Sequence, residues 1–143
     1  MRESVKDFFA ALHRVYLKPR AYRKVRHTFS REMDAYTERV QFQGSSWNDS
    51  TSPWRFYINF GVEFHNLPPR FPCRDFPNTH CWTRIEGIVP SAPAQYDLPG
   101  RRFEDFSAEI AGYLETASQR VSRRIGRIRA AYEQKKWPLL TLT

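Results

Sequence analysis

The sequence has no apolar run that approaches the length of a membrane span. A spanning helix needs about 20 consecutive, mainly apolar residues, and charged or polar residues interrupt every apolar stretch of this chain before that length. The first residues lead into an amphipathic segment and not into the apolar core of a signal peptide. We therefore expect a cytoplasmic protein that does not act at a membrane.

The sequence also lacks a cofactor fingerprint, a glycine-rich nucleotide loop and a recognisable catalytic motif. Enzymatic chemistry needs a positioned nucleophile with its base, or paired carboxylates. Each histidine is a possible base, but none stands beside a nucleophile motif: His13, His27, His65 and His80. We expect no cofactor, and an enzyme of unknown class is the weakest of the functions considered.

Cysteine is scarce, with Cys73 and Cys81 alone in the chain. These thiols and His65 and His80 are ligand types that zinc accepts, but tetrahedral zinc sites usually pair their ligands at short spacing. Here the two cysteines are eight positions apart and His80 is adjacent to Cys81. We expect reduced thiols and no metal site.

The sequence does contain enough apolar and aromatic residues to form a hydrophobic core. Of the 143 residues, 41% are hydrophobic and 15% are aromatic, which excludes a wholly disordered chain. This length is typical of one domain. We expect a single domain over residues 1–143, with the tail 137–143 a candidate to pack back onto it.

The net charge of +8 is concentrated in two parts of the chain. Residues 14–31 contain seven basic residues and no acidic one, and residues 117–136 contain seven basic residues against Glu133. Such clustering favours anionic partners, which include nucleic acid, acidic proteins and phosphate. It does not choose among them.

Two helices are predicted, one near each end of the chain. Apolar residues at helical spacing run from Val5 to Tyr16, and Pro19 ends that helix near Leu17. A second, long amphipathic helix is expected from Phe103 to Tyr132, interrupted at most by one of its glycines.

Three or four antiparallel strands are predicted between the helices. Residues 27–33 and 36–43 form a hairpin, residues 54–64 alternate apolar and polar side chains, and residues 81–87 supply a short strand. The fold class is therefore α+β, with an antiparallel sheet and both helices on its apolar face. The opposite face is left for function.

Several short segments together resemble a known family. They are Phe8 to Leu12, Leu17-Lys18-Pro19, Thr28-Phe29-Ser30-Arg31, Val40-Gln41-Phe42-Gln43, Phe56-Tyr57-Ile58-Asn59-Phe60-Gly61-Val62 and Cys81-Trp82-Thr83-Arg84-Ile85. With these the chain is similar to the bacterial domain-of-unknown-function family 4304, most closely over residues 8–85. The resemblance implies a small bacterial α+β protein and carries no assigned reaction. The basic C-terminal helix is a feature of this chain that we do not attribute to the family.

The first candidate site is the basic face of the C-terminal helix. Four arginines lie together opposite the apolar stripe on a helical wheel: Arg120, Arg123, Arg124 and Arg127. Guanidinium groups bind carboxylates and phosphates. The alternative interpretation is an ordinary solvated helix face.

The second candidate site is the polar face of the sheet. Its residues have amide, phenol or guanidinium groups suited to a polar ligand or peptide: Gln41, Gln43, Arg55, Tyr57, Asn59 and Arg84. The alternative interpretation is cross-strand pairing, for instance of Arg84 or Arg55 with Glu63.

Charged surface without catalytic machinery favours a non-catalytic protein-binding module. We expect a small bacterial accessory or immunity-type protein that uses the arginine-rich helix, the polar sheet face, or both. The alternative is a nucleic-acid-binding protein that uses the same arginines.

Overall fold

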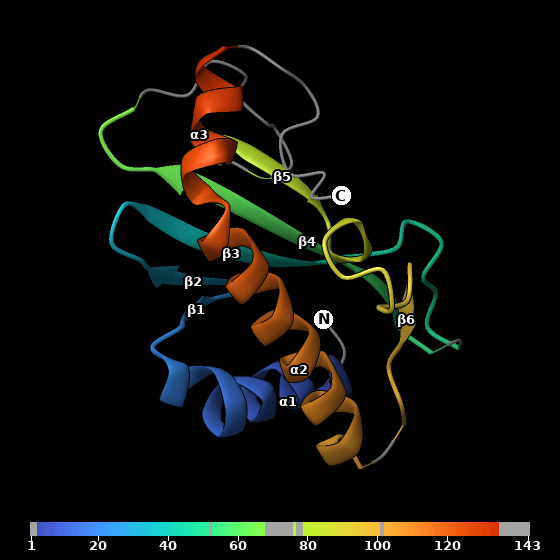
Figure 1. Ribbon diagram of the computed structural model, residues 1–143. Coiled ribbons are helices and arrows are strands. Elements are labelled where there is room, and N and C mark those ends of the chain that lie inside the picture. Colours follow the sequence, from blue (N-terminus) through green and yellow to red (C-terminus); the bar gives the residue numbers. More distant parts are fainter. Residues whose placement is uncertain (1–2, 52, 68–75, 77–78, 101, 135–143) are drawn as a thin grey trace.

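The N-terminal segment forms a helix that lies beside the sheet (Figure 1), and its apolar residues are buried in the same core as those of the sheet. The computed structural model describes residues 3–51, 53–67, 76, 79–100 and 102–134. Helix α1 (Glu3–Leu12) continues as a π-helical turn η1 (His13–Leu17) and a 3-10 turn η2 (Lys18–Arg20). The π-helical turn thus ends at Leu17, as predicted, but a 3-10 turn carries the chain through Pro19 to Arg20, and Ala21 then turns it with a φ of 69°.

An antiparallel sheet in the order β1-β2-β3-β4-β5 forms the centre of the molecule. Its strands are β1 (Arg23–Val25), β2 (Thr28–Glu32), β3 (Tyr36–Gly44), β4 (Arg55–Phe64) and β5 (Cys81–Arg84), and β6 (Tyr96–Asp97) pairs with the first residues of β4. The prediction of three to four strands was wrong, because the structure has six in its described residues. The two unexpected strands, β1 and β6, are too short to show an alternating pattern.

One face of the sheet is apolar and is covered by helices. The even-numbered residues of β4 from Phe56 to Phe64 are all buried, as the alternation predicts. The ring of Phe8 in α1 lies 6.0 Å from that of Phe56, which in turn lies 6.1 Å from Phe106 in α2 (Glu104–Arg123). Burying one such phenylalanine contributes about 1.5–3 kcal/mol. The helices and the apolar face therefore form one core.

The long C-terminal helix is present but interrupted. Helix α2 ends at Arg123 and α3 (Ile125–Glu133) follows, with Arg124 between them at φ −115° and ψ 12°. The break lies two residues before Gly126, one of the two glycines where an interruption was expected. Helix α3 extends the helical layer to the far end of β4, where the ring of Tyr132 lies 5.9 Å from that of Phe64 (Figure 1).

None of the helices in the described ranges is both long and apolar enough to cross a bilayer. The predicted packing of the tail 137–143 falls outside the described residues. Whether residues 1–143 form one domain stays a prediction.

Candidate binding site on the polar face of the sheet

Strand register brings the predicted polar residues of three strands into neighbouring positions. Gln41 in β3 is paired with Asn59 in β4, and Asn59 is paired with Arg84 in β5. Gln43 is paired with Tyr57. The residues of β3 and β4 lie in the phase opposite to the buried apolar residues, and Arg84 is paired with Asn59, so all five side chains share the face that the helices leave uncovered.

These five residues form one interacting group, which we call the amide–arginine cluster: Gln41, Gln43, Tyr57, Asn59 and Arg84. Asn59 Nδ2 donates hydrogen bonds to Oε1 of Gln41 at 2.8 Å and Oε1 of Gln43 at 3.0 Å. Arg84 Nη1 donates to Asn59 Oδ1 at 2.6 Å and to Gln43 Oε1 at 3.0 Å. The guanidinium carbon of Arg84 also lies 4.4 Å from the centre of the Tyr57 ring. The cluster therefore holds its members in fixed orientations.

The sixth predicted residue, Arg55, does not join the cluster. Its Nε donates to Oδ1 of Asp97 at 2.9 Å, where β6 meets the start of β4. Glu63 pairs neither with Arg55 nor with Arg84; it accepts a hydrogen bond from Nη2 of Arg39 at 2.9 Å. The sequence interpretation missed Arg39, although its alternation with Val40 placed it on this face.

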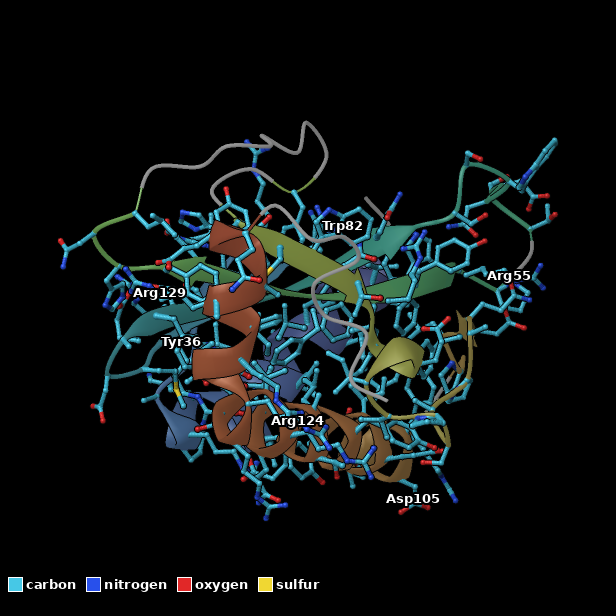
Figure 2. The ribbon with its side chains drawn as sticks, turned by 45° about the horizontal axis from the view of Figure 1, so that its top comes forward. Tyr36, Arg55, Trp82, Asp105, Arg124 and Arg129 are labelled. Atoms are coloured by element: carbon cyan, nitrogen blue, oxygen red, sulfur yellow. The ribbon has the colours of Figure 1, made fainter. Side chains whose placement is uncertain are left out.

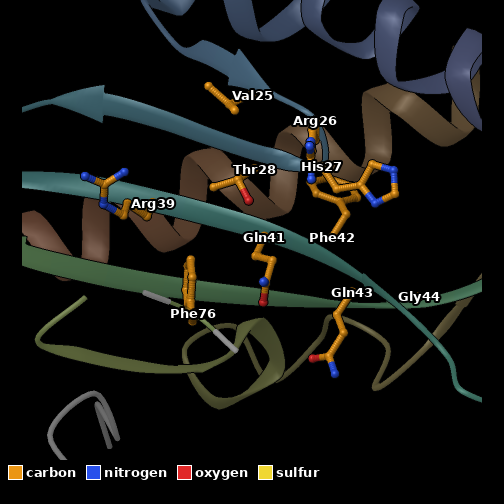
Figure 3. Close-up of a pocket in the computed structure, with 10 residues that line it drawn as sticks. All are labelled: Val25, Arg26, His27, Thr28, Arg39, Gln41, Phe42, Gln43, Gly44 and Phe76. Atoms are coloured by element: carbon orange, nitrogen blue, oxygen red, sulfur yellow. The ribbon is translucent and has the colours of Figure 1, made fainter. Parts of the chain in front are cut away.

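A cavity of about 870 Å³ lies beside the cluster, within the usual size range of ligand sites (Figure 3). Gln41 and Gln43 belong both to the cluster and to the cavity wall. The other lining residues come from the β1–β2 hairpin, from β3 and from the segment after β4: Val25, Arg26, His27, Thr28, Arg39, Phe42, Gly44 and Phe76. The cavity therefore combines amide groups, guanidinium groups and an aromatic wall.

Phe76 forms that wall because β4 has a glycine beneath it. A Cβ on Gly61 would lie 2.7 Å from Phe76 Cε1 and 2.8 Å from Thr79 Cγ2, distances that real Cβ atoms do not show. The Phe76 ring also packs edge-on against Trp82, at 6.3 Å between centres. The absence of a side chain at Gly61 thus allows Phe76 to lie directly on the sheet.

Basic groups dominate the electrostatics of the cavity wall. Arg26 and Arg39 are on it, and among the lining residues in the described part of the chain there is no carboxylate. Burial lowers the pKa of His27 below its ordinary 6.5, and the nearby charges of Lys24 and Arg26 lower it further. His27 stacks on Phe9, with 4.6 Å between the ring centres. It is consequently neutral at pH 7 and fixed in place by the core.

The arginines of the first candidate site lie on the helical layer, away from this cavity. Figure 2 shows Arg124 on the opposite side of the sheet from Trp82, which is on the polar face. Arg120 Nη1 donates to the carbonyl oxygen of Ile88 at 2.8 Å, so this guanidinium is partly engaged within the fold. Arg123 and Arg127 are exposed and make no ion pair with any residue in the described part of the chain.

The histidines and cysteines do not gather into a metal site in the part of the chain that the structure describes. Cys81 is buried, and burial raises the pKa of its thiol to about 12, so the thiol stays protonated. His80 Nδ1 accepts the Phe64 backbone N–H at 2.9 Å, and His65 Nε2 lies 3.1 Å from Glu32 Oε2. Cys73 lies outside the described residues.

A second polar group was not predicted, and we call it the sealed cluster: Tyr22, Arg31, Glu38 and Ser118. It lies between the sheet and α2, and Glu38 is 0% exposed. Glu38 accepts hydrogen bonds from Tyr22 Oη at 2.7 Å, from Arg31 Nη2 at 3.0 Å and from Ser118 Oγ at 3.0 Å. The sequence signal was available, because Glu38 is in phase with Val40 and Phe42 on the apolar face.

The family described as "Domain of unknown function (DUF4304)" matches residues 14–141 of this sequence. The chain belongs to that family. The match confirms the resemblance seen in the sequence and extends it through α2 and α3, the part that we had not attributed to the family. No curated protein and no solved structure matches the chain. Membership of DUF4304 therefore assigns no activity to the chain, and its function is inferred from the site.

Proposed function

We propose that this protein is a non-catalytic protein-binding module whose partner docks on the polar face of the sheet. The observation that carries the proposal is the amide–arginine cluster, which presents hydrogen-bonding groups in fixed orientations at the edge of a large cavity. Groups that are already ordered lose little conformational entropy when a partner binds, so more of the interaction energy appears as affinity. The cluster supplies donors and acceptors without a nucleophile, which suits recognition better than chemistry.

The arginine-rich helix supports a weaker second candidate, nucleic-acid binding. The specific observation in its favour is that Arg123 and Arg127 are exposed and unpaired within the described residues. Against it, Arg120 is bonded to a backbone carbonyl and Arg124 lies at the break between two helices. Filter binding at two salt concentrations tests this candidate, since phosphate contacts give a steep loss of affinity with salt that Arg123→Ala and Arg127→Ala reduce.

We also propose that the protein acts in the bacterial cytoplasm as an accessory or immunity-type protein. This rests on the resemblance to a bacterial family and on a charged surface without a recognisable catalytic motif. A toxin or defence gene beside the coding gene would support it.

Site-specific crosslinking followed by measured affinity tests the docking face. A photoreactive residue is placed at Tyr57, on the polar face, or at Arg127, on the helical layer, and the protein is irradiated in its native cell. We expect a partner to crosslink from position 57 and not from position 127. The purified partner should then bind the unlabelled protein in calorimetry, and Asn59→Ala should weaken this binding by about tenfold, the equivalent of 1.4 kcal/mol.

Arg123→Ala is the matched control, since it removes a guanidinium group from the helical layer and leaves the sheet unchanged. A partner that crosslinks only from position 127, or whose affinity falls with Arg123→Ala and not with Asn59→Ala, would contradict the proposal.

A further inference from the structure

The wall of the cavity beside the amide–arginine cluster is basic, and a further arginine lies behind it. Arg26 and Arg39 line it, and Arg84 is hydrogen-bonded to the lining residue Gln43. Glu63 binds Arg39 from outside the wall. A ligand in the cavity therefore meets guanidinium and amide groups.

Arg39 has hydrogen-bonding capacity that the described residues leave unused. A guanidinium has five N–H donors, and Glu63 accepts from Nη2 alone, at 2.9 and 3.4 Å. Nε of Arg39 is buried without a partner. Because Nε has almost no accessible surface, a ligand would reach this guanidinium through the Nη groups, whose remaining N–H donors have no acceptor among the described residues.

The wall also has an apolar part. Val25 in β1 is 68% exposed, one of the few large apolar side chains at the surface, and it lines the same cavity as the ring of Phe76. A ligand made only of charged groups would leave this part uncovered. The combination suits a polypeptide that carries both acidic and apolar side chains.

We propose that the partner segment bound in this cavity is acidic and extended, with carboxylates directed to Arg26 and Arg39 and separate apolar side chains against Val25 and against Phe76. The side-chain NH₂ group of Gln43 is suited to a carbonyl oxygen of its backbone, since Oε1 of Gln43 already accepts from Asn59 and Arg84. This inference rests on the proposed function and adds the chemistry of the partner.

Labelled peptides test the charge preference directly. The probe is a short fluorescein-labelled peptide in which Glu alternates with Thr around a central Leu, and its counterpart has Gln at every Glu position. Binding is followed by fluorescence anisotropy at low and at high salt. We expect the acidic peptide to bind at least about tenfold more tightly than the Gln peptide, and to weaken as salt screens the charges.

Variants assign the effect to the cavity. Arg26→Gln combined with Arg39→Gln should weaken the acidic peptide by about tenfold, as expected for the loss of two partly exposed charge pairs. Glu63→Gln should strengthen binding by a few fold, because it removes the carboxylate that competes for Arg39. A merely structural role of the Arg39–Glu63 pair predicts no such gain. Arg123→Gln with Arg127→Gln is the control and should change nothing.

The outcomes separate this inference from the proposed function. Equal binding of the two peptides, or no binding of the acidic peptide, overturns the acidic partner, while the proposed function still stands if the crosslinked partner depends on Asn59. If neither peptide binds, and if Asn59→Ala leaves the affinity for the crosslinked partner unchanged, both the acidic partner and the proposed function are overturned. Preferential binding of a single-stranded poly-dT oligonucleotide through Arg26 and Arg39 would replace the acidic protein by nucleic acid.

Discussion

Two hydrogen-bonded polar groups lie on opposite faces of the same sheet, and they differ in what surrounds them. In the sealed cluster, helix α2 covers Glu38, and donors from three separate parts of the chain satisfy its carboxylate. In the amide–arginine cluster, a guanidinium group is balanced by neutral amides, and a cavity lies alongside. The carboxylate at the centre of the first group has no exposed surface, whereas Gln41, Gln43 and Arg84 in the second group are partly exposed and can contact a partner.

The largest expected effect is the loss of stability when the sealed cluster is broken. Arg31→Leu leaves Glu38 buried without its positive partner, and removing one member of a buried ion pair typically costs about 3–5 kcal/mol. Urea unfolding followed by circular dichroism measures it. Arg31→Leu combined with Glu38→Leu should recover much of the loss, since no uncompensated charge remains. A loss below about 1 kcal/mol for the single variant would show that the network is not essential to the fold.

The next effect lies on the polar face, at Gly61, where Phe76 closely approaches the strand. Gly61→Ala introduces a Cβ at 2.7 Å from Phe76 Cε1. Overpacking of this kind costs about 1–3 kcal/mol. Thermal unfolding of Gly61→Ala measures it, and Gly112→Ala is the control, because no atom lies within 4 Å of a Cβ at Gly112. Equal midpoints for Gly61→Ala and the wild type would contradict the close approach of Phe76.

Breaking the amide–arginine cluster should cost less than breaking the sealed cluster. Asn59→Ala removes three hydrogen bonds, but Gln41, Gln43 and Arg84 are only partly buried and can bind water instead. We expect a loss of about 1 kcal/mol in unfolding free energy. A loss as large as that of Arg31→Leu would remove the distinction drawn between the two clusters.

Two titratable groups, Glu38 and His27, should respond to pH with opposite signs. Burial raises the pKa of Glu38 above its ordinary 4.5, against the opposing effect of Arg31. The folded chain therefore holds this proton more tightly than the unfolded chain, and the contribution to stability is lost as pH rises above 4.5. The difference in unfolding free energy between wild type and Glu38→Gln should shrink between pH 4 and 7 in a urea series. A growing difference would show that the pKa is lowered.

The smallest effect concerns His27, on the cavity wall. Its pKa lies below 6.5 because of burial and the charges of Lys24 and Arg26, so the unfolded chain takes up the proton first as pH falls. The wild type should lose stability from pH 6.5 downwards, and His27→Gln should lose less. An NMR titration of the His27 ring checks the direction independently, and a midpoint above 6.5 would contradict it.

The sequence predicted the two clusters to different extents. For the amide–arginine cluster it predicted which residues share a face, but not which of them are in contact. The alternation of β4 indicated which side chains share the polar face, and Gln41, Gln43, Tyr57, Asn59 and Arg84 do lie there. Their convergence depends on register, which pairs residues as much as 25 positions apart and has no local signal. Arg55 shows the limit of the pattern. It lies in the same strand phase, but the short strand β6 gives it a different partner.

The sequence analysis did not predict the sealed cluster, because the local sequence around each member gives no sign of its distant partners. Glu38 lies at an apolar position of β3, and Arg31 is in phase with buried Phe29. A charged residue at a core position predicts a buried polar cluster only when its partners are known. One partner of Glu38, Ser118, is 80 residues away in sequence. The break at Arg124 was placed wrongly for a related reason, since glycine propensity was considered and the tertiary packing of α3 was not.

That break has a consequence for how a helical layer can follow a sheet. Neighbouring strands of a twisted sheet are rotated by about 20–25° relative to one another. A long straight helix therefore contacts such a sheet only near the middle of the helix. Because the chain bends at Arg124, Tyr132 reaches the Phe64 end of β4 and lies against His80, at 5.2 Å between the ring centres. One residue outside helical geometry thus allows a helical layer longer than α2 alone to keep contact with a curved surface.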